Sequence, residues 1–276
     1  MAISDSDTSS LPAATGRVAK IYQYPVKGLT PHRLEAVDVT EGEPLPFDRA
    51  FAIERATGKF DPLAPSYLPK VNFLMLMRDE KLAQLDAKFD ETDQSLSIHR
   101  DGRRVVRGAL DTPIGRSMIE QFFAGLMQPE VRGMPKIVQA PGHSFSDVAA
   151  KCVHIVNLES VRALERVANR SIDPLRFRAN IYVDGLPEWS EFDWLDKRIR
   201  IGSAELSVWA RTERCAATNV DPETAARDMA IPALLQRAFG HTDFGVYARV
   251  NTTTSIAEGD TVDVATQQTR REDQSA

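Results

Sequence analysis

The chain has 276 residues, of which 42% are hydrophobic and 26% charged, a composition typical of a globular protein with a sizeable core. Its formal net charge of −5 argues against a protein that coats nucleic acid or an anionic membrane. No apolar run approaches the ~20 residues needed to cross a bilayer, and the first residues lack the features of a secretory signal. With only two cysteines, we expect a cytoplasmic protein without a disulfide framework.

Short antiparallel strands are predicted for the first hundred residues. Strand patterns lie within 17–29, 32–42 and 48–60, and each ends in turn residues. An Asp-Gly pair separates two alternating runs within 95–108, which is a strong hairpin signal.

Three later segments have helical patterns. Residues 113–127 repeat apolar side chains at Met118, Phe122 and Leu126. Residues 157–170 form a second predicted helix, and its candidate cap is Asn157.

The remaining pattern completes a β-rich α+β chain of two halves, which join near residues 105–130. The third helical stretch spans 222–240, interrupted at Pro232 and closed by Gly240. A hairpin is predicted in 198–211 and a last strand in 255–264.

Cys215 is the first candidate for chemistry. It follows a strand predicted over 205–211 and comes directly after Arg214. A side chain at a strand end is well placed to face a cleft, and neighbouring guanidinium groups lower the pKa of a thiol. The alternative is a buried structural cysteine beside surface arginines.

Three other segments place polar side chains at strand ends. "YPVKGL" (24–29) puts a lysine on a proline–glycine turn, "FDRAFAI" (47–53) an Asp-Arg pair before a strand, and "RFRANIYVDG" (176–185) two arginines and an asparagine before another. Each motif alone is weak, because such side chains are usually just solvated.

With "RCAATNVDPET" (214–224) and "AEGDTV" (257–262), these motifs resemble one family. The chain is similar to MOSC-domain proteins (molybdenum cofactor sulfurase C-terminal) with an N-terminal MOSC β-barrel domain, as in the mitochondrial amidoxime-reducing component group. The resemblance covers about residues 16–265. It implies a β-barrel-like domain over 16–115 packed against a MOSC β-barrel over 116–265. Disordered tails are expected at 1–15 and 266–276.

The resemblance implies that Cys215 is the protein ligand of molybdenum in a molybdopterin cofactor, and it carries pyridoxal phosphate binding as a domain-level association. A soft thiolate suits a high-valent metal that sulfur already binds. The expected cofactor-binding residues are Lys27, Gly28, Arg49, Arg178, Asn180, Arg214 and Ser160.

Different chemistry is expected of these residues. Lys27 would hold the cofactor phosphate as a point charge, and Arg49 and Arg178 could bind it bidentately. Asn180 could offer a donor and an acceptor to the pterin edge, and the helix start at Ser160 could add backbone N–H groups. We predict that the cations converge with Cys215 in one cleft between the two halves.

Two main hypotheses of function follow. The first is a molybdenum-dependent oxidoreductase that reduces a small N-hydroxylated compound. Its electrons would come from a separate ferredoxin- or flavoprotein-type partner, because the chain lacks the cysteines of an iron–sulfur cluster. The second is a carrier of persulfide sulfur or of the cofactor, without redox turnover. A plain β-rich binding module would require every motif match to be coincidence.

Several chemistry-bearing residues are expected to be bystanders. Cys152 lies in an apolar strand and is predicted to be buried and inert. The five histidines show no metal-ligand spacing, and the three tryptophans are interpreted as packing residues. Glu213 stands where the family often has a small hydroxyl residue, and we expect a bend in the chain to turn it away from the metal.

Overall fold

In a computed structural model of the chain, the described residues are 15–56, 58–131 and 133–264. The tails predicted at 1–15 and 266–276 fall almost entirely outside these residues. Within them, no helix is long and apolar enough to cross a membrane. The architecture is the predicted β-rich α+β class, with a seven-stranded barrel, smaller sheets and three α-helices.

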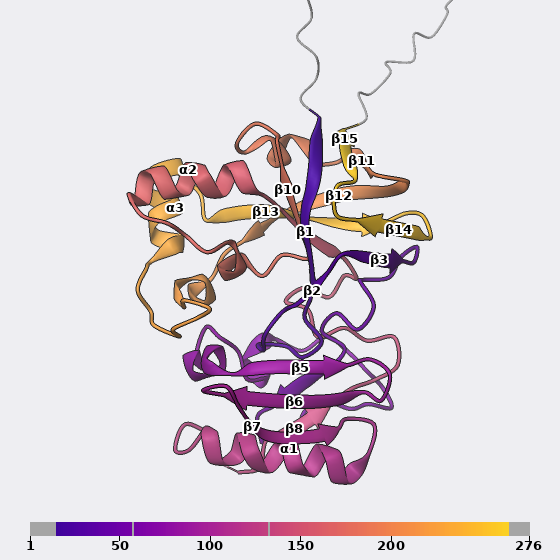
Figure 1. Cartoon of the computed structure of the whole chain (residues 1–276), viewed down its shortest axis with the longest axis vertical. Coiled ribbons are helices and arrows are strands. Elements are labelled where there is room, and N and C mark those ends of the chain that lie inside the picture. Colours follow the sequence, from indigo (N-terminus) through magenta and orange to yellow (C-terminus); the bar gives the residue numbers. More distant parts are fainter. Residues whose placement is uncertain (1–14, 57, 132, 265–276) are drawn as a thin grey trace, which may run out of the picture.

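The barrel occupies the upper part of the molecule in Figure 1. Its strand order is β10-β9-β13-β12-β11-β15-β1, and pairing of β10 with β1 closes it. The β9–β10 pair is parallel, whereas the other barrel pairs are antiparallel. The strands are β1 (Gly16–Gln23), β9 (Val153–Asn157), β10 (Ile181–Asp184), β11 (Arg198–Ile201), β12 (Ala204–Glu213), β13 (Asp243–Val250) and β15 (Thr261–Val264).

Alternating side chains fill the barrel. Along β12, Leu206 and Val208 point into the core, and Val246 and Ala248 do so along β13. This period of two buries one face of each strand and leaves the other face free to line a site. Burial of these apolar faces stabilises the barrel by roughly 25 cal/mol per Å².

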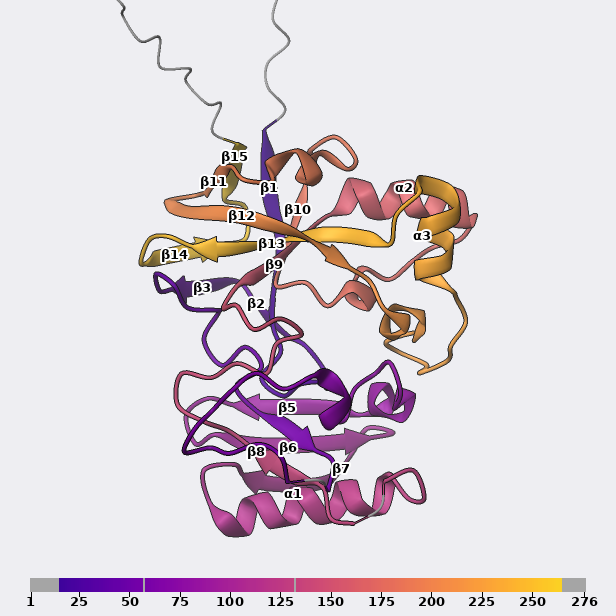
Figure 2. The ribbon, with the colours of Figure 1, turned by 180° about the vertical axis from the view of Figure 1, so that it is seen from behind.

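Smaller elements surround the barrel. β2 (His32–Leu34) extends it beside β1, and β3 (Ala36–Val39) pairs with β14 (Thr254–Ala257). The helices α2 (Leu158–Ala168) and α3 (Ile231–Phe239) lie together on one side, as Figures 1 and 2 both show.

The second unit has its own hydrophobic core beneath the barrel. A three-stranded sheet is formed by β5 (Asp86–Asp90), β6 (Ser95–Arg100) and β7 (Arg103–Ala109). The strands β4 (Ala52–Glu54) and β8 (Lys136–Val138) pair separately, and α1 (Pro113–Leu126) packs on β7. The predicted hairpin joins β6 and β7 at Asp101-Gly102.

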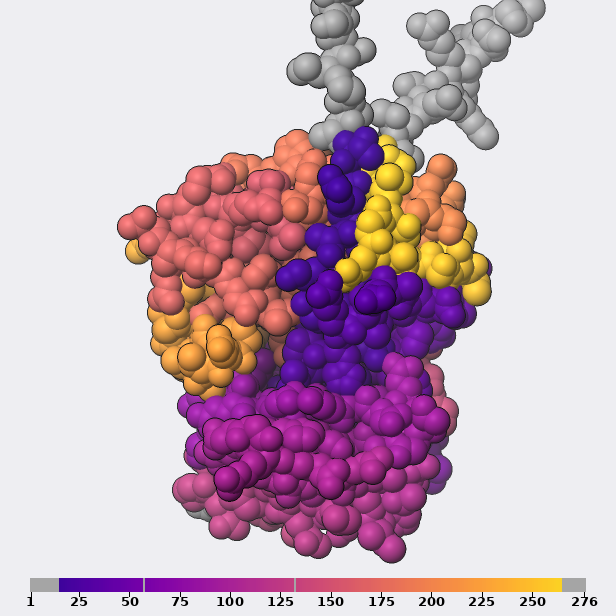
Figure 3. Space-filling model, in the orientation of Figure 1, coloured from indigo at the N-terminus to yellow at the C-terminus, as the bar shows by residue number. Residues whose placement is uncertain are grey.

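The two units interleave along the chain. β1 lies in the barrel beside β15, so Figure 3 shows the N-terminal strand next to the C-terminal one. Conversely, α1 and β8 belong spatially to the lower unit. The domain boundary predicted between residues 115 and 116 therefore stays a prediction about the sequence. The two spatial units each contain segments from both sides of it.

Two helical predictions are corrected in detail. α1 buries Gly115, Ile119 and Phe123, whereas Met118 is 47% exposed. The helix turns this way because a Cβ at position 115 would lie 2.1 Å from the Ala109 carbonyl oxygen, so glycine allows close contact with β7.

The other correction concerns the stretch 222–240, of which only α3 is helical. α3 begins at Ile231 with Pro232 in its first turn, so the proline starts the helix rather than interrupting it. Gly240 ends α3 with φ 79°, as predicted. Asp221 and Pro222 belong to a turn, in which the Asp221 carboxylate accepts from the backbone N–H of Thr224.

Candidate functional site

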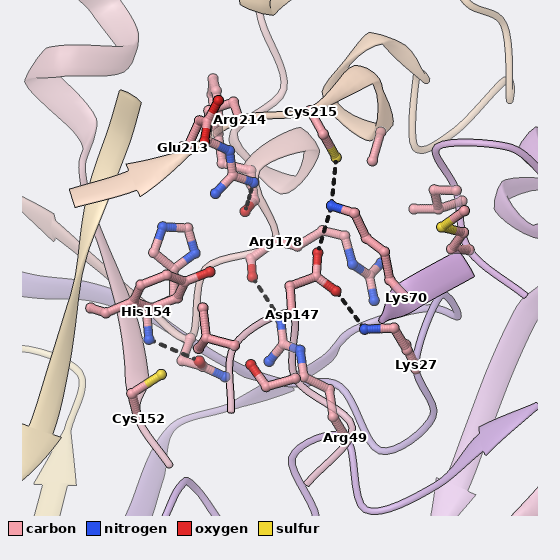
Figure 4. Close-up of a pocket in the computed structure, with 18 of the residues that line it drawn as sticks. Lys27, Arg49, Lys70, Asp147, Cys152, His154, Arg178, Glu213, Arg214 and Cys215 are labelled. Carbon is pink, nitrogen blue, oxygen red and sulfur yellow. Dashed lines mark hydrogen bonds and ion pairs between the residues drawn. The ribbon is translucent and has the colours of Figure 1, made fainter. Parts of the chain in front are cut away.

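A pocket of about 370 Å³ lies between the barrel and the lower unit (Figure 4). One wall is the outer face of β9, β12 and β13, and loops from both units form the rest. Every predicted site residue lines it except Ser160. The predicted residues that line the pocket are Lys27, Gly28, Arg49, Arg178, Asn180, Arg214 and Cys215.

The pocket lining is strongly cationic. Seven Lys and Arg side chains line it but only three acidic ones, in a chain whose net charge is negative. The cations are Lys27, Arg49, Lys70, Arg176, Arg178, Arg211 and Arg214, and the acids are Asp48, Asp147 and Glu213. Such a concentration of one sign focuses the field in a concave site and favours an anionic ligand.

Asp48 is the centre of a buried frame behind the pocket. Its Oδ1 accepts from the backbone N–H of Tyr24 at 2.9 Å and from Asn180 Nδ2 at 3.0 Å, and its Oδ2 contacts the Arg49 guanidinium. Arg49 also donates to the Arg178 carbonyl oxygen at 3.0 Å. Asp48 therefore orients Arg49.

Asn180 belongs to the same frame. Its Oδ1 accepts from the His154 backbone N–H at 3.1 Å, and its Nδ2 donates to the Tyr22 carbonyl oxygen as well as to Asp48. Both ends of the amide are thus occupied within the protein. The structure gives Asn180 a positioning role, where the sequence suggested hydrogen bonds to a pterin edge.

Arg178 is a cation without an acidic partner. It follows the turn Pro174–Phe177 with φ 51°, and its guanidinium lies 4.3 Å from the centre of the Tyr24 ring. Across the described part of the chain, no carboxylate lies within 4.0 Å of it. Burial lowers the pKa of Arg178 to about 10. An anion in the pocket would supply the missing countercharge.

A chain of alternating charges reaches Cys215 (Figure 4). Lys27 Nζ lies 2.5 Å from Asp147 Oδ1, and Lys70 Nζ lies 3.3 Å from Asp147 Oδ2. Lys70 Nζ is also 3.3 Å from Cys215 Sγ. Although burial opposes the change, the two lysines hold the pKa of Asp147 well below its usual range.

The sequence missed Lys70 and Asp147. Lys70 begins the short 3-10 helix Lys70–Asn72 and Asp147 lies in a loop; neither segment has a local pattern, and 77 residues separate the two. Gly28 was named, and its φ of 84° shows why a glycine follows Lys27 in this turn.

Arg214 does not play the part expected next to the thiol. Its guanidinium donates to the Phe177 carbonyl oxygen at 2.8 Å, and its buried Nε has no hydrogen-bond partner among the described residues. The cation that contacts the sulfur is Lys70 instead. Arg214 nevertheless lines the pocket, with no carboxylate within 4.0 Å of it among the described residues.

The chain between β12 and Cys215 is irregular. The pairing of β12 with β13 shifts register between Arg211 and Glu213, so the expected break in regularity is present. Glu213 still lines the pocket, with an exposed side chain, and was not turned out of it. Cys215 is half-buried, and its carbonyl oxygen accepts from the Thr218 backbone N–H at 3.1 Å.

Ser160 lies outside the pocket, in contrast to its predicted role. It is buried on α2, where its hydroxyl donates to Glu191 Oε2 at 2.9 Å and accepts from the Trp189 N–H at 2.8 Å. Asn157 caps the helix by accepting from the Glu159 N–H. The start of α2 is therefore a structural element.

Of the residues that were expected to play no part in the site, some are buried in the protein and others line the pocket. Cys152 is buried as expected, and burial raises the pKa of its thiol to about 12. Trp194 packs in the barrel core, but Trp209 is 40% exposed and lines the pocket. In the described ranges, no three His, Cys, Asp or Glu side chains gather as a metal site.

Two segments of the chain match known domain families. Residues 15–127 match the MOSC N-terminal beta barrel domain, and residues 140–263 match the MOSC domain. The chain is a MOSC-domain protein. In this MOSC protein both matched segments build the pocket, since Lys27 and Lys70 come from the first and Arg178 and Cys215 from the second.

Solved structures that match the chain include YuaD and two YiiM proteins. YuaD from Bacillus subtilis is 12% identical over 91% of this chain and 95% of its own, with a TM-score of 0.43. YiiM from Geobacillus stearothermophilus is 19% identical over 43% and 56%, with a TM-score of 0.34. YiiM from Escherichia coli is 18% identical over 42% and 54%, with a TM-score of 0.32. No curated protein sequence matches this chain.

Proposed function

We propose that this MOSC protein is a molybdenum-cofactor-dependent oxidoreductase that reduces small N-hydroxylated compounds. A separate ferredoxin- or flavoprotein-type protein would donate the electrons. The observation that carries the proposal is one pocket in which a half-buried thiol, Cys215, lies among seven cationic side chains. MOSC domains are associated with molybdenum cofactor and sulfur chemistry, and this pocket has the groups that such chemistry requires.

The donor set fits a phosphate-bearing pterin cofactor with a soft metal. Arg178 and Arg214 both line the pocket, and neither has a carboxylate within 4.0 Å among the described residues, so an anion would give both a countercharge. Cys215 supplies one thiolate ligand, which suits a metal whose other ligands are the sulfur and oxo groups of the cofactor. When bound, the cofactor would supply the electron transfer and oxygen abstraction that side chains cannot perform.

The other residues of the pocket would position the ligands. Lys27 already contacts the Phe145 carbonyl oxygen at 2.8 Å and Asp147, which leaves at most one ammonium proton for a ligand. Asp147 holds Lys70 beside the sulfur. Arg178 and Arg214 therefore have the greatest capacity to bind an anion, and Lys27 and Arg49 fix the surrounding frame.

The proposed reaction cleaves an N–O bond. An N-hydroxylated compound takes up two electrons and two protons and releases the amine or amidine and water. The partner protein supplies the electrons and solvent the protons, so the stoichiometry is complete. Cys215 is half-buried, so a metal that it held would be within reach of a small substrate.

A carrier of persulfide sulfur is the second candidate, and the Lys70 contact favours it. The Lys70 ammonium lies 3.3 Å from Cys215 Sγ, a contact that serves a sulfur that binds metal and one that carries sulfur alike. Sulfur carriage, however, has no use for Arg178 and Arg214. These cations favour the cofactor enzyme.

A direct assay tests the proposal. Protein made in a host that synthesises molybdenum cofactor is incubated with benzamidoxime and a reduced artificial dye. We expect dye oxidation and benzamidine in equal amounts, and neither from protein made in a cofactor-deficient host. Loaded protein that reduces no N–O bond would contradict the enzyme, and transfer of labelled sulfur from Cys215 would then identify the carrier.

A further inference from the structure

Trp209 lies at an irregularity of the barrel wall. Val208 pairs with Ala248 and Ala210 pairs with Tyr247, so the register shift leaves Trp209 as the extra residue of a β-bulge. Bulges of this kind redirect side chains next to functional sites. The Trp209 side chain is 40% exposed and lines the pocket, so it is not committed to the core.

The aromatic neighbours of Trp209 form a row across three strands. The Trp209 and Tyr247 rings stack with centroids 5.7 Å apart and an angle of 16° between their planes. His154 follows on β9, with its ring centroid 5.4 Å from that of Tyr247. All three line the pocket, because the alternate residues of β9 and β13 fill the barrel interior.

The pocket therefore has two chemically different linings. Loops supply cations, among them Lys70, Arg178 and Arg214, whereas the barrel face supplies stacked rings. Packing alone accounts for Tyr247, which Trp209 covers. It does not account for the exposed part of the tryptophan, the largest apolar side chain in the lining. A flat ring of a ligand would remove that surface from water and gain stacking.

We propose that Trp209, supported by Tyr247, is a specificity-determining residue that stacks the planar aromatic ring of the N-hydroxylated substrate. The inference rests on the proposed function. A substrate ring is favoured over the pterin because Trp209 is 40% exposed, whereas Lys27, in the frame around the proposed cofactor site, is only 6% exposed. Trp209 therefore distinguishes ring-bearing substrates from small ring-free ones.

Binding measured by calorimetry tests the stacking without any turnover. The full chain, loaded with cofactor, is titrated with benzamidoxime and with acetamidoxime, which lacks the ring. We expect Trp209→Leu to weaken benzamidoxime binding about tenfold, the scale of one aromatic stack, and to leave acetamidoxime binding unchanged. Trp209→Phe should retain most of the benzamidoxime affinity. Ile114→Ala, an exposed apolar change on α1, is the matched control.

Two further readouts separate the outcomes. The molybdenum and pterin content of Trp209→Leu should equal that of the parent, and a loss of pterin would assign the rings to the cofactor and overturn the inference. Equal benzamidoxime affinity in Trp209→Leu and the parent would overturn it as well. A parent that binds the ring through Trp209 but reduces no N–O bond would reject the proposed enzyme and leave the stacking residue in place.

Discussion

Arg176 and Arg178 lie two residues apart and both line the pocket, yet the region around each is built differently. On the structural side, Arg176 bonds to Asp221 and Asp228 at 2.7 Å each, and it also reaches the Asn219 carbonyl oxygen. On the pocket side, Arg178 has the Tyr24 ring and no carboxylate within 4.0 Å in the described ranges. The first arginine holds loops together, and the second is left for a ligand.

The comparison teaches how to tell a structural charge from a ligand-binding one. A buried charge without a partner is costly, so a fold retains it where a ligand completes it. The two cysteines show the same contrast, since Cys152 is buried with a raised thiol pKa and Cys215 is half-buried beside Lys70. Four predictions follow from this contrast.

Replacing the two cysteines should give the largest difference. Cys215→Ala removes the proposed metal ligand, so N–O reduction should fall to background while the midpoint of thermal unfolding stays within a few degrees. The matched change Cys152→Ala should keep activity, because that thiol is not ionised. Equal activity of Cys215→Ala with normal molybdenum content would refute the ligand assignment, and failure to fold would make it a structural cysteine.

Replacing the two arginines should separate stability from binding. Arg176→Met leaves Asp221 without its cation, whereas Asp228 keeps Arg170, and losing the buried arginine should cost about 3 kcal/mol of unfolding free energy. Arg178→Met should change stability by less than ~1 kcal/mol and lower cofactor content instead. Urea denaturation measures the change in stability, and metal analysis measures the cofactor content. Equal destabilisation by both variants would show that Arg178 is a structural residue like Arg176.

Glu191, a buried acid outside the pocket, tests whether a buried charge without a partner is costly. Burial raises its pKa from 4.5 to about 7, and its Oε1 has no partner among the described residues. Because the folded state binds the proton more tightly, the contribution of Glu191 to stability is complete below pH 4.5 and is lost as the pH rises towards 7.

The comparison variant is Glu191→Gln, which keeps an acceptor for Ser160 and cannot ionise. Between pH 4.5 and 8 the parent should lose about 3 kcal/mol relative to this variant. Chemical denaturation of both proteins across that range measures the difference. Parallel stability profiles would show that the carboxyl group has found a partner or solvent.

Arg214→Ala should have the smallest of the four effects. It removes a guanidinium group that lines the pocket, and its bond to the Phe177 carbonyl oxygen is lost as well. Cofactor affinity should fall by about 2 kcal/mol, or roughly thirtyfold, the scale of one charge-assisted hydrogen bond. Cofactor dissociation into dilute buffer can be followed by pterin fluorescence. An unchanged affinity would show that Arg214 has a structural role and does not bind the cofactor.

Local sequence signals predicted local structure well. Sequence patterns located the hairpins within 95–108 and 198–211, and Asn157 caps α2 as expected. These features depend on neighbours in sequence. The same reasoning missed the start of α3 and the buried face of α1, because packing against distant elements decides which residues are covered.

The site was harder to predict than its strongest motifs suggest. Cys215 and the cations of the family motifs could be named, but Lys70 and Asp147 could not, since loop residues that meet across two units carry no periodic signal. Asn180 and Ser160 were given ligand roles, yet their polar groups are occupied by Asp48, His154 and Glu191. Only the folded chain shows which polar groups have partners.

Metal and pterin content tests the central claim most directly. The full chain is purified from a host that makes molybdenum cofactor and is measured by elemental analysis and pterin release. The account predicts about one molybdenum and one pterin per chain, with less of both in Arg178→Met and an unchanged content in Ile114→Ala. Protein that leaves such a host with neither molybdenum nor pterin would contradict the assignment of this pocket.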